Sequence, residues 1–219
     1  MATSNPFSAV PAARHTATFA TMALIGIGYC LVILVAMHFL RPDYNPIRNT
    51  TSDYAIGPYG ILMTSGFYAL GLGSLALVIG LYQGLSQPAR SWVGLLLLGL
   101  SAVGNILAAI FPTDLEGTPE TPSGNIHGTV SLFVLTGLVF GTIVLSRRFK
   151  KDERWKPFYH TALIWSLMIL LMSILLVTTF ALELNFGGLL DRMLLVAAFT
   201  WSLLTATRLR SITLGSGSR

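Results

Sequence analysis

Six apolar runs, each about 20 residues long, set the strongest limit on how this chain folds. They cover residues 18–40, 59–82, 92–111, 127–146, 161–182 and 186–207. A helix rises 1.5 Å per residue, so about 20 apolar residues cross the hydrocarbon core of a membrane. We therefore predict an all-α, polytopic integral membrane bundle of six transmembrane helices.

Composition supports this class and excludes others. The chain is 53% hydrophobic and only 11% charged, which lies outside the range of soluble globular domains. The net charge of +5 does not indicate nucleic-acid binding, because the basic residues form short clusters beside the apolar runs. The single cysteine, Cys30, excludes an intrachain disulfide.

The loops alternate in charge, and this alternation predicts the orientation. All but three of the 14 lysines and arginines fall in the N-terminal leader, the second and fourth loops, and the C-terminal tail. The exceptions are Arg41, Arg48 and Arg192. Because basic residues stay on the cytoplasmic side, we expect both termini to be cytoplasmic. The predicted organisation is a disordered leader (1–17), a membrane domain (18–208) and a flexible tail (209–219).

Small residues recur within the spans at helix-packing spacing. They are Gly66, Gly73 and Gly80; Gly94, Ser101 and Ala108; and Gly137 with Gly141. In lipid, helices associate largely through close backbone contact, which small residues permit. This spacing predicts tightly packed seams between helices.

Polar residues gather near the outer ends of the spans. Two proline-rich loops, 41–60 and 112–125, lie on that side, and we expect both to be chains of turns that form lids. The residues expected to surround one outer pocket are His38, Ser52, Asp53, Asp114, His127, Asp191 and Arg192.

Asp191 and Arg192 are the most informative pair, because charges inside a span are costly and face partners. Their expected partners are Asp53, Asp114 and Glu183. One interpretation is a structural salt-bridge network, or an Arg192 that extends to the interface. The other makes Arg192 a clamp for a phosphate or carboxylate.

Catalysis is one interpretation of Asp53, Asp114 and His127, since a histidine polarised by a carboxylate activates a serine such as Ser52, or a water. The alternative for Ser52 and Asp53 is an N-cap of the second span. Neither a nucleophile elbow nor an HExxH pair is present. His38 and His127 also leave open a haem or pigment site, or a metal site completed by one carboxylate.

The chain resembles a known family in several motifs. YNP, SDYAIGPYG, FPTD, NIHG and GLLDR follow in order, with a later Trp201. This order resembles the bacterial six-span membrane family catalogued as domain of unknown function 998, and the resemblance covers residues 18–208. Asp191 departs from the glutamate expected before Arg192. More distantly, Ser52, Asp53 and His127 are similar to six-span eukaryotic proteins that take part in remodelling the lipids of glycolipid anchors.

The resemblance implies a bacterial inner membrane and, by analogy alone, lipid handling. We therefore expect an outer-face polar pocket that binds or processes a lipid or small amphipathic ligand. The alternatives are a non-catalytic accessory subunit of a larger membrane complex, or a haem- or pigment-binding protein using His38 and His127. Expected partners are membrane lipids, with a homo-oligomer or larger complex left open. Enzymatic activity and cofactors also remain open.

Overall fold

The computed structural model describes residues 9–115 and 117–215, which contain helices and no strand. The long helices are α1 (Ala9–Leu40), α2 (Gly60–Gly84), α3 (Trp92–Ile110), α4 (Pro122–Phe149), α5 (Tyr159–Ala181) and α6 (Gly187–Gly215). Two short 3₁₀ helices, η2 (Ser52–Ala55) and η3 (Lys156–Phe158), lie between them. All 6 long helices are sufficiently long and apolar to cross a membrane, which confirms the predicted bundle.

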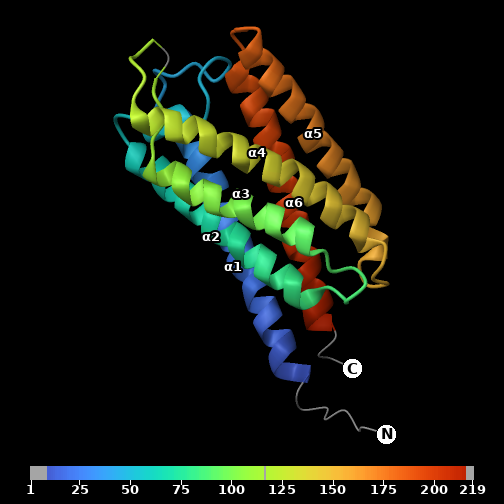
Figure 1. Ribbon diagram of the computed structural model, residues 1–219. Coiled ribbons are helices and arrows are strands. Elements are labelled where there is room, and N and C mark those ends of the chain that lie inside the picture. The colour runs from blue at the N-terminus through green and yellow to red at the C-terminus, as the bar shows by residue number, and fades with distance from the viewer. Residues whose placement is uncertain (1–8, 116, 216–219) are drawn as a thin grey trace, which may run out of the picture.

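The helices form a closed bundle in chain order. Each packs against the next, and α6 returns to pack against α1 and α2 (Figure 1). The start of α1 and the end of α6 lie at the same end of the bundle, together with loops 85–91 and 150–158 (Figure 1). We call this the terminal end. Loops 41–59, 111–121 and 182–186 meet at the opposite end, the three-loop end.

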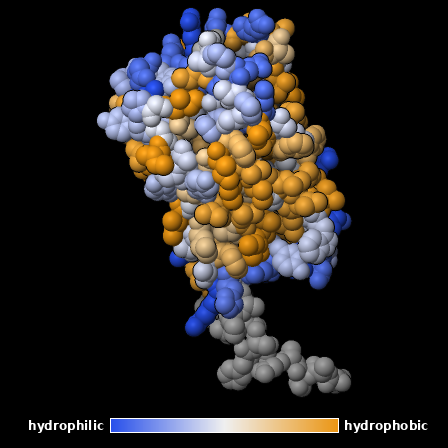
Figure 2. Space-filling model, turned by 60° about the vertical axis from the view of Figure 1, so that its left-hand side comes forward, coloured by the Kyte–Doolittle hydropathy of each residue, from blue (hydrophilic) through white to orange (hydrophobic). Residues whose placement is uncertain are grey.

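The surface has the pattern expected of a membrane protein. In Figure 2, apolar residues cover the middle of the visible face, and hydrophilic residues lie above and below them. Large apolar side chains such as Ile25, Leu96 and Phe133 are well exposed on the outside of the bundle. Such a belt is stable in lipid rather than in water.

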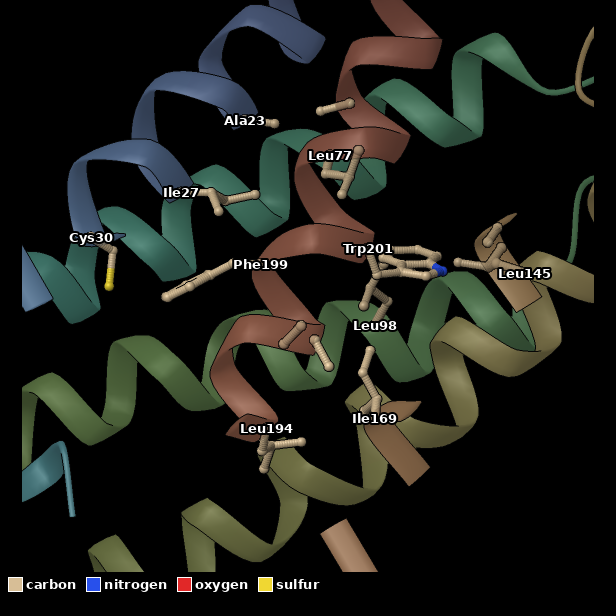
Figure 3. Packing of buried hydrophobic residues seen from close by; sticks show 14 of the residues in the cluster. Ala23, Ile27, Cys30, Leu77, Leu98, Leu145, Ile169, Leu194, Phe199 and Trp201 are labelled. Carbon is tan, nitrogen blue, oxygen red and sulfur yellow. The ribbon is translucent and has the colours of Figure 1, made fainter. Parts of the chain in front are cut away.

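Helix α6 passes through the centre of the bundle, where Phe199 and Trp201 pack among α1 to α4 (Figure 3). The indole nitrogen of Trp201 donates a hydrogen bond to Ser146 Oγ over 2.9 Å. Ser146 is also 2.9 Å from the hydroxyl of Ser166 on α5. Buried polar groups need partners, and here they link α4, α5 and α6.

The glycine seams are confirmed, and they are used within the chain. A Cβ on Gly73 would lie 3.1 Å from the backbone nitrogen of Ile27 on α1. On α4, a Cβ on Gly137 would lie 2.5 Å from the Leu97 carbonyl oxygen, and one on Gly141 would lie 2.9 Å from a backbone nitrogen of α3. Backbone therefore touches backbone at the α1–α2 and α3–α4 contacts.

The expected leader and tail are corrected by the structure. Helix α1 begins at Ala9, so residues 9–17 are helical rather than disordered. Alanines recur in this segment, and alanine is the strongest helix former. Helix α6 continues to Gly215, with Leu209 fully buried, so packing extends the helix through most of the expected tail. Residues 1–8 and 216–219 lie outside the described residues.

Loop 112–125 was expected to be turns throughout, but α4 already begins at Pro122. The hydroxyl of Thr121 accepts a hydrogen bond from the Gly124 amide over 3.1 Å and caps the helix. Proline at the first helical position has the required φ and lacks only an amide that would be unpaired there. The prediction missed this start because it treated proline only as a helix breaker.

Asp152 organises the terminal end. Its carboxylate forms an ion pair of 2.7 Å with Arg154 and accepts a 2.9 Å hydrogen bond from the Ser86 amide. Arg154 also donates to the Gly84 carbonyl at the end of α2 over 2.8 Å. Burial opposes ionisation of Asp152, but hydrogen bonds from Arg154 and from the Ser86 and Arg154 amides outweigh it. Together they lower its pKa to about 2.

Gly137→Ala tests the α3–α4 seam. The added methyl group would overlap the Leu97 carbonyl, so we expect a loss of about 1–3 kcal/mol in stability, although alanine is the better helix former. Gly99→Ala on α3 is the control, because a Cβ there meets nothing within 4 Å. Thermal unfolding in detergent measures both. Equal midpoints for the two variants would contradict the tight seam.

Asp152→Asn tests the terminal end. Removing the charge weakens the hydrogen bonds from Ser86 and Arg154, so we expect the free energy of unfolding to fall by about 1–3 kcal/mol at pH 7. The folded pKa of Asp152 is depressed to about 2, so its stabilisation is present above the unfolded pKa and is lost as pH falls through the folded value. The gap between wild type and variant should therefore close as pH falls from about 4 towards 2. A gap that is constant across that range would contradict this role.

Candidate functional site

Loop 41–59 is held in shape from its first residue. Arg41 is only 5% exposed and donates hydrogen bonds of 2.6 and 3.2 Å to the carbonyls of Ile56 and Pro58. It also pairs with Asp43 over 2.8 Å and lies 4.1 Å above the ring of Tyr44. The guanidinium lowers the pKa of the Asp43 carboxyl. Arg41 thus ties the beginning of the loop to its end.

The middle of this loop covers the first turn of α6. The amides of Gly188 and Leu189 donate to the carbonyls of Arg48 and Ile47 over 3.1 and 3.0 Å. The first amides of a helix have no partner within the helix, so the loop supplies one for these two. A Cβ on Gly188 would overlap the carbonyl of Asn49, so glycine is required for this close approach.

Arg192 fastens the same loop from inside α6. Its guanidinium donates to His38 Nε2 over 2.8 Å, to the Asn49 carbonyl over 2.7 Å and to the Tyr54 hydroxyl over 3.1 Å. His38 Nδ1 lies 2.7 Å from the Leu34 carbonyl, which only accepts, so Nδ1 carries the proton and Nε2 is the acceptor. Arg192 therefore bonds to neutral protein groups on α1 and in the loop.

Asp191 faces the loop as well, where its carboxylate accepts the Thr51 amide over 2.8 Å. The expected ion-pair partners of Asp191 and Arg192 were wrong. Within the described residues, Arg192 forms no ion pair with any carboxylate. Loop carbonyls, a tyrosine hydroxyl and a histidine satisfy this charge instead.

Asp53 shapes the turn that carries Ser52. It accepts from the amide and hydroxyl of Thr50 over 2.9 and 3.2 Å. Burial raises the pKa of Asp53, and Asp191 nearby acts in the same direction. The alternative that Ser52 and Asp53 cap the second span was wrong. Both residues belong to η2, and α2 begins only at Gly60, after Tyr59 in a left-handed conformation (φ 60°).

Asp114 fixes loop 111–121 by accepting hydrogen bonds from a threonine, as Asp53 does in loop 41–59. Its carboxylate accepts the amide and hydroxyl of Thr121, each over 2.8 Å. Thr121 in turn caps α4, and a Cβ on Gly124 would overlap the Asp114 carboxylate. Asp114 therefore fixes the start of the helix that carries His127.

His127 joins the two loops. Its Nδ1 lies 2.8 Å from the Phe111 carbonyl, and its Nε2 lies 3.2 Å from Ser52 Oγ. The carbonyl only accepts, so Nδ1 carries the proton and Nε2 accepts the serine hydroxyl. The His127 residue is only 5% exposed. This is the arrangement in which a serine hydroxyl passes its proton to a histidine.

A cavity of about 740 Å³ opens at this place. It is lined by Arg48, Thr50, Ser52, Asp53, Thr113, Asp114, His127, Ser131, Leu176, Thr179, Phe180, Glu183, Leu184, Asn185, Gly187 and Asp191. Five of the seven predicted site residues are among them, and Asp53 and His127 therefore share one cavity. His38 and Arg192 are not, because they lie behind the loop that forms the wall.

Arg48 is a site residue that the sequence did not predict. Its side chain lines the cavity, and its guanidinium makes no hydrogen bond or ion pair to another described residue. A signal was present in its position, since it is one of only three basic residues on the side expected to be outside. The wall residues from α5, Leu176 and Phe180, also escaped prediction, because an apolar helix face does not indicate which of its residues border a cavity.

The structure does not favour a shared haem or metal site. Both ring nitrogens of His38 and of His127 are engaged by protein groups. Only His127 lines the cavity. Among the described residues, no group of three or more histidine, cysteine, aspartate and glutamate side chains has the geometry to hold a metal ion.

Comparison with known proteins gives one match. The family model described as "Protein of unknown function (DUF998)" matches residues 24–208. No curated protein and no solved structure matches the chain, so the more distant similarity to proteins of glycolipid-anchor remodelling gains no support. The match spans α2 to α5 completely and most of α1 and α6, and it includes every residue that lines the cavity. The chain therefore belongs to the DUF998 family.

Proposed function

We propose that the cavity binds a membrane lipid or a similar amphipathic ligand, with its polar head among the loops and its apolar part against α5. One observation carries this proposal: a single cavity has a polar floor and an apolar wall that reaches the lipid-facing surface. Ser52 and His127 belong to the floor, and Leu176 and Phe180 belong to the wall. Ligand sites commonly combine an apolar lining with a few placed polar groups.

Fewer charged side chains of the cavity are free to bind a ligand than the number of charged residues there suggests. Asp53, Asp114 and Asp191 line the cavity, but each accepts hydrogen bonds from nearby loop residues. Their charges therefore serve mainly to shape the walls. Arg48 and Glu183 have no such partners among the described residues. A headgroup that carries a phosphate would pair with Arg48.

The apolar wall opens sideways. Helices α4 and α5 diverge towards the three-loop end (Figure 1), where the cavity is lined by Ser131 of α4 and Phe180 of α5. Phe180 is 56% exposed and belongs to the apolar outer surface. A lipid would enter between these helices with its chain still in the bilayer.

The side of the membrane follows from charge. The terminal end carries Arg147, Arg148, Lys150, Lys151 and Arg154, whereas the three-loop end carries most of the acidic residues. The positive-inside rule then gives a cytoplasmic terminal end. The cavity would therefore face the outer leaflet.

Ser131→Trp tests lipid binding. The indole would fill the space between α4 and α5, so the purified protein should retain at least tenfold less lipid, because the chain and the indole would compete for the same volume. Mass spectrometry of lipids extracted from detergent-purified protein measures this. Leu132→Trp is the matched control, since Leu132 is 60% exposed and is not part of the cavity wall.

Thermal unfolding of both variants separates binding from folding. Equal midpoints with lipid lost only from Ser131→Trp support the proposal. Equal lipid retention by wild type and by Ser131→Trp, at similar midpoints, would refute it.

A further inference from the structure

We propose that Ser52 and His127 are a nucleophile and its general base, and that they cleave a carboxylic ester in the bound lipid. This inference rests on the proposed lipid-binding function and adds a reaction to it. Their side chains meet across 3.2 Å although they are 75 positions apart in sequence. Both line the cavity that would hold the polar head and the ester linkages next to it.

The protonation of His127 suits this role. The Phe111 carbonyl holds the proton on Nδ1, which leaves the Nε2 lone pair directed at Ser52. In serine hydrolases a carboxylate holds the histidine in this tautomer and stabilises the charged ring. Here a backbone carbonyl holds the tautomer.

That carbonyl is suited to stabilising charge. Phe111 is the C-cap of α3, so its carbonyl lies at the end of the helix where unpaired carbonyls carry partial negative charge. A positive imidazolium at a helix C-terminus is favourable. The end of α3 thus stabilises the charged ring that forms when His127 takes the Ser52 proton.

The two partners are held by separate supports. Ser52 sits on η2, whose turn Asp53 fixes through Thr50. His127 sits near the start of α4, which Asp114 fixes through Thr121. Since both positions are fixed before any ligand arrives, the pair is preorganised for proton transfer. Arg48, which lines the cavity from the same loop as Ser52, would hold an anionic headgroup while the ester lies near the serine.

The reaction balances with water as the only co-reactant. Ser52 Oγ would attack the ester carbonyl carbon while its proton moves to His127 Nε2. The tetrahedral intermediate collapses, the bond to the alcohol oxygen breaks, and His127 returns the proton to that oxygen. Water then attacks the acyl-serine carbonyl carbon while His127 Nε2 takes its proton. Collapse breaks the bond from that carbon to Ser52 Oγ, His127 returns the proton to Oγ, and a carboxylic acid is released.

The test uses hexadecyl fluorophosphonate on the full chain in lipid nanodiscs. An activated serine displaces fluoride and keeps the phosphonyl group, which mass spectrometry of peptides locates. We expect an adduct on Ser52 in the wild type and none in Ser52→Ala. Ser65→Ala is the control, because Ser65 lies on α2 and does not line the cavity. This variant should form the Ser52 adduct as the wild type does.

His127→Asn tests the base. The asparagine amide still donates to the Phe111 carbonyl, but no basic nitrogen faces Ser52. The labelling rate should therefore fall about 100-fold or more. His160→Gln, at the terminal end, is the control and should label at the wild-type rate. His127→Gln replaces the asparagine variant if the latter has a lowered thermal midpoint.

The outcomes separate this inference from the proposed function, because lipid retention is measured on the same preparations. An adduct on Ser52 that depends on His127 supports the inference. Folded protein that retains lipid but forms no Ser52 adduct overturns catalysis and leaves lipid binding standing. A Ser52 adduct that forms equally fast in His127→Asn overturns the role of the histidine. Wild-type protein that neither retains lipid nor forms the Ser52 adduct overturns both proposals.

Discussion

The attachment of loop 41–59 to the first turn of α6 is the interaction on which the three-loop end depends. Two α6 amides donate to loop carbonyls, Asp191 accepts a loop amide, and Arg192 donates to Asn49 and Tyr54. A charge this close to the membrane core is costly unless its donors are satisfied. The same hydrogen bonds that satisfy Arg192 therefore order the loop, and the loop in turn positions η2 and Ser52. From the sequence, Arg192 suggests a ligand-binding residue. In the structure it instead holds in place the loop that forms the cavity wall.

A second support brings His127 to the same place. Asp114 links to Thr121, Thr121 caps α4, and His127 bonds back to the end of α3 through Phe111. This support joins α3 and α4, which also share the tight seam at Gly137. The seam sets how closely the two helices approach, and the ends of both helices then position the histidine. Stability in the middle of the bundle and geometry at the three-loop end are thus linked through α3 and α4.

The sequence predicted the parts of the structure that depend on many residues at once. Span positions follow from the summed cost of burying about 20 residues in lipid, and the seams follow from repeated glycines. Predictions that depended on one pairing were less successful. Arg192 was expected to meet a carboxylate, but carbonyls and a neutral histidine are not visible as charges in a sequence. The alternative of a helix cap at Ser52 was wrong because Gly57 and Tyr59, both with positive φ, form a separate turn before α2. Ser52 and His127 were named together, but no local pattern showed that the fold would place them in contact.

The roles of charge at this site follow from what each carboxylate accepts. Asp53, Asp114 and Asp191 look like catalytic acids in the sequence, but each accepts donors from the loops that carry it. A carboxylate that must keep its donors to maintain the fold is poorly suited to exchange protons with a substrate. Ser52 and His127 differ, because among the described residues the Ser52 hydroxyl and His127 Nε2 bond only to each other, and both residues line the cavity. Moving a proton between them breaks no support of either loop. For this reason we assign the reaction to Ser52 and His127, and the shape of the site to the three aspartates.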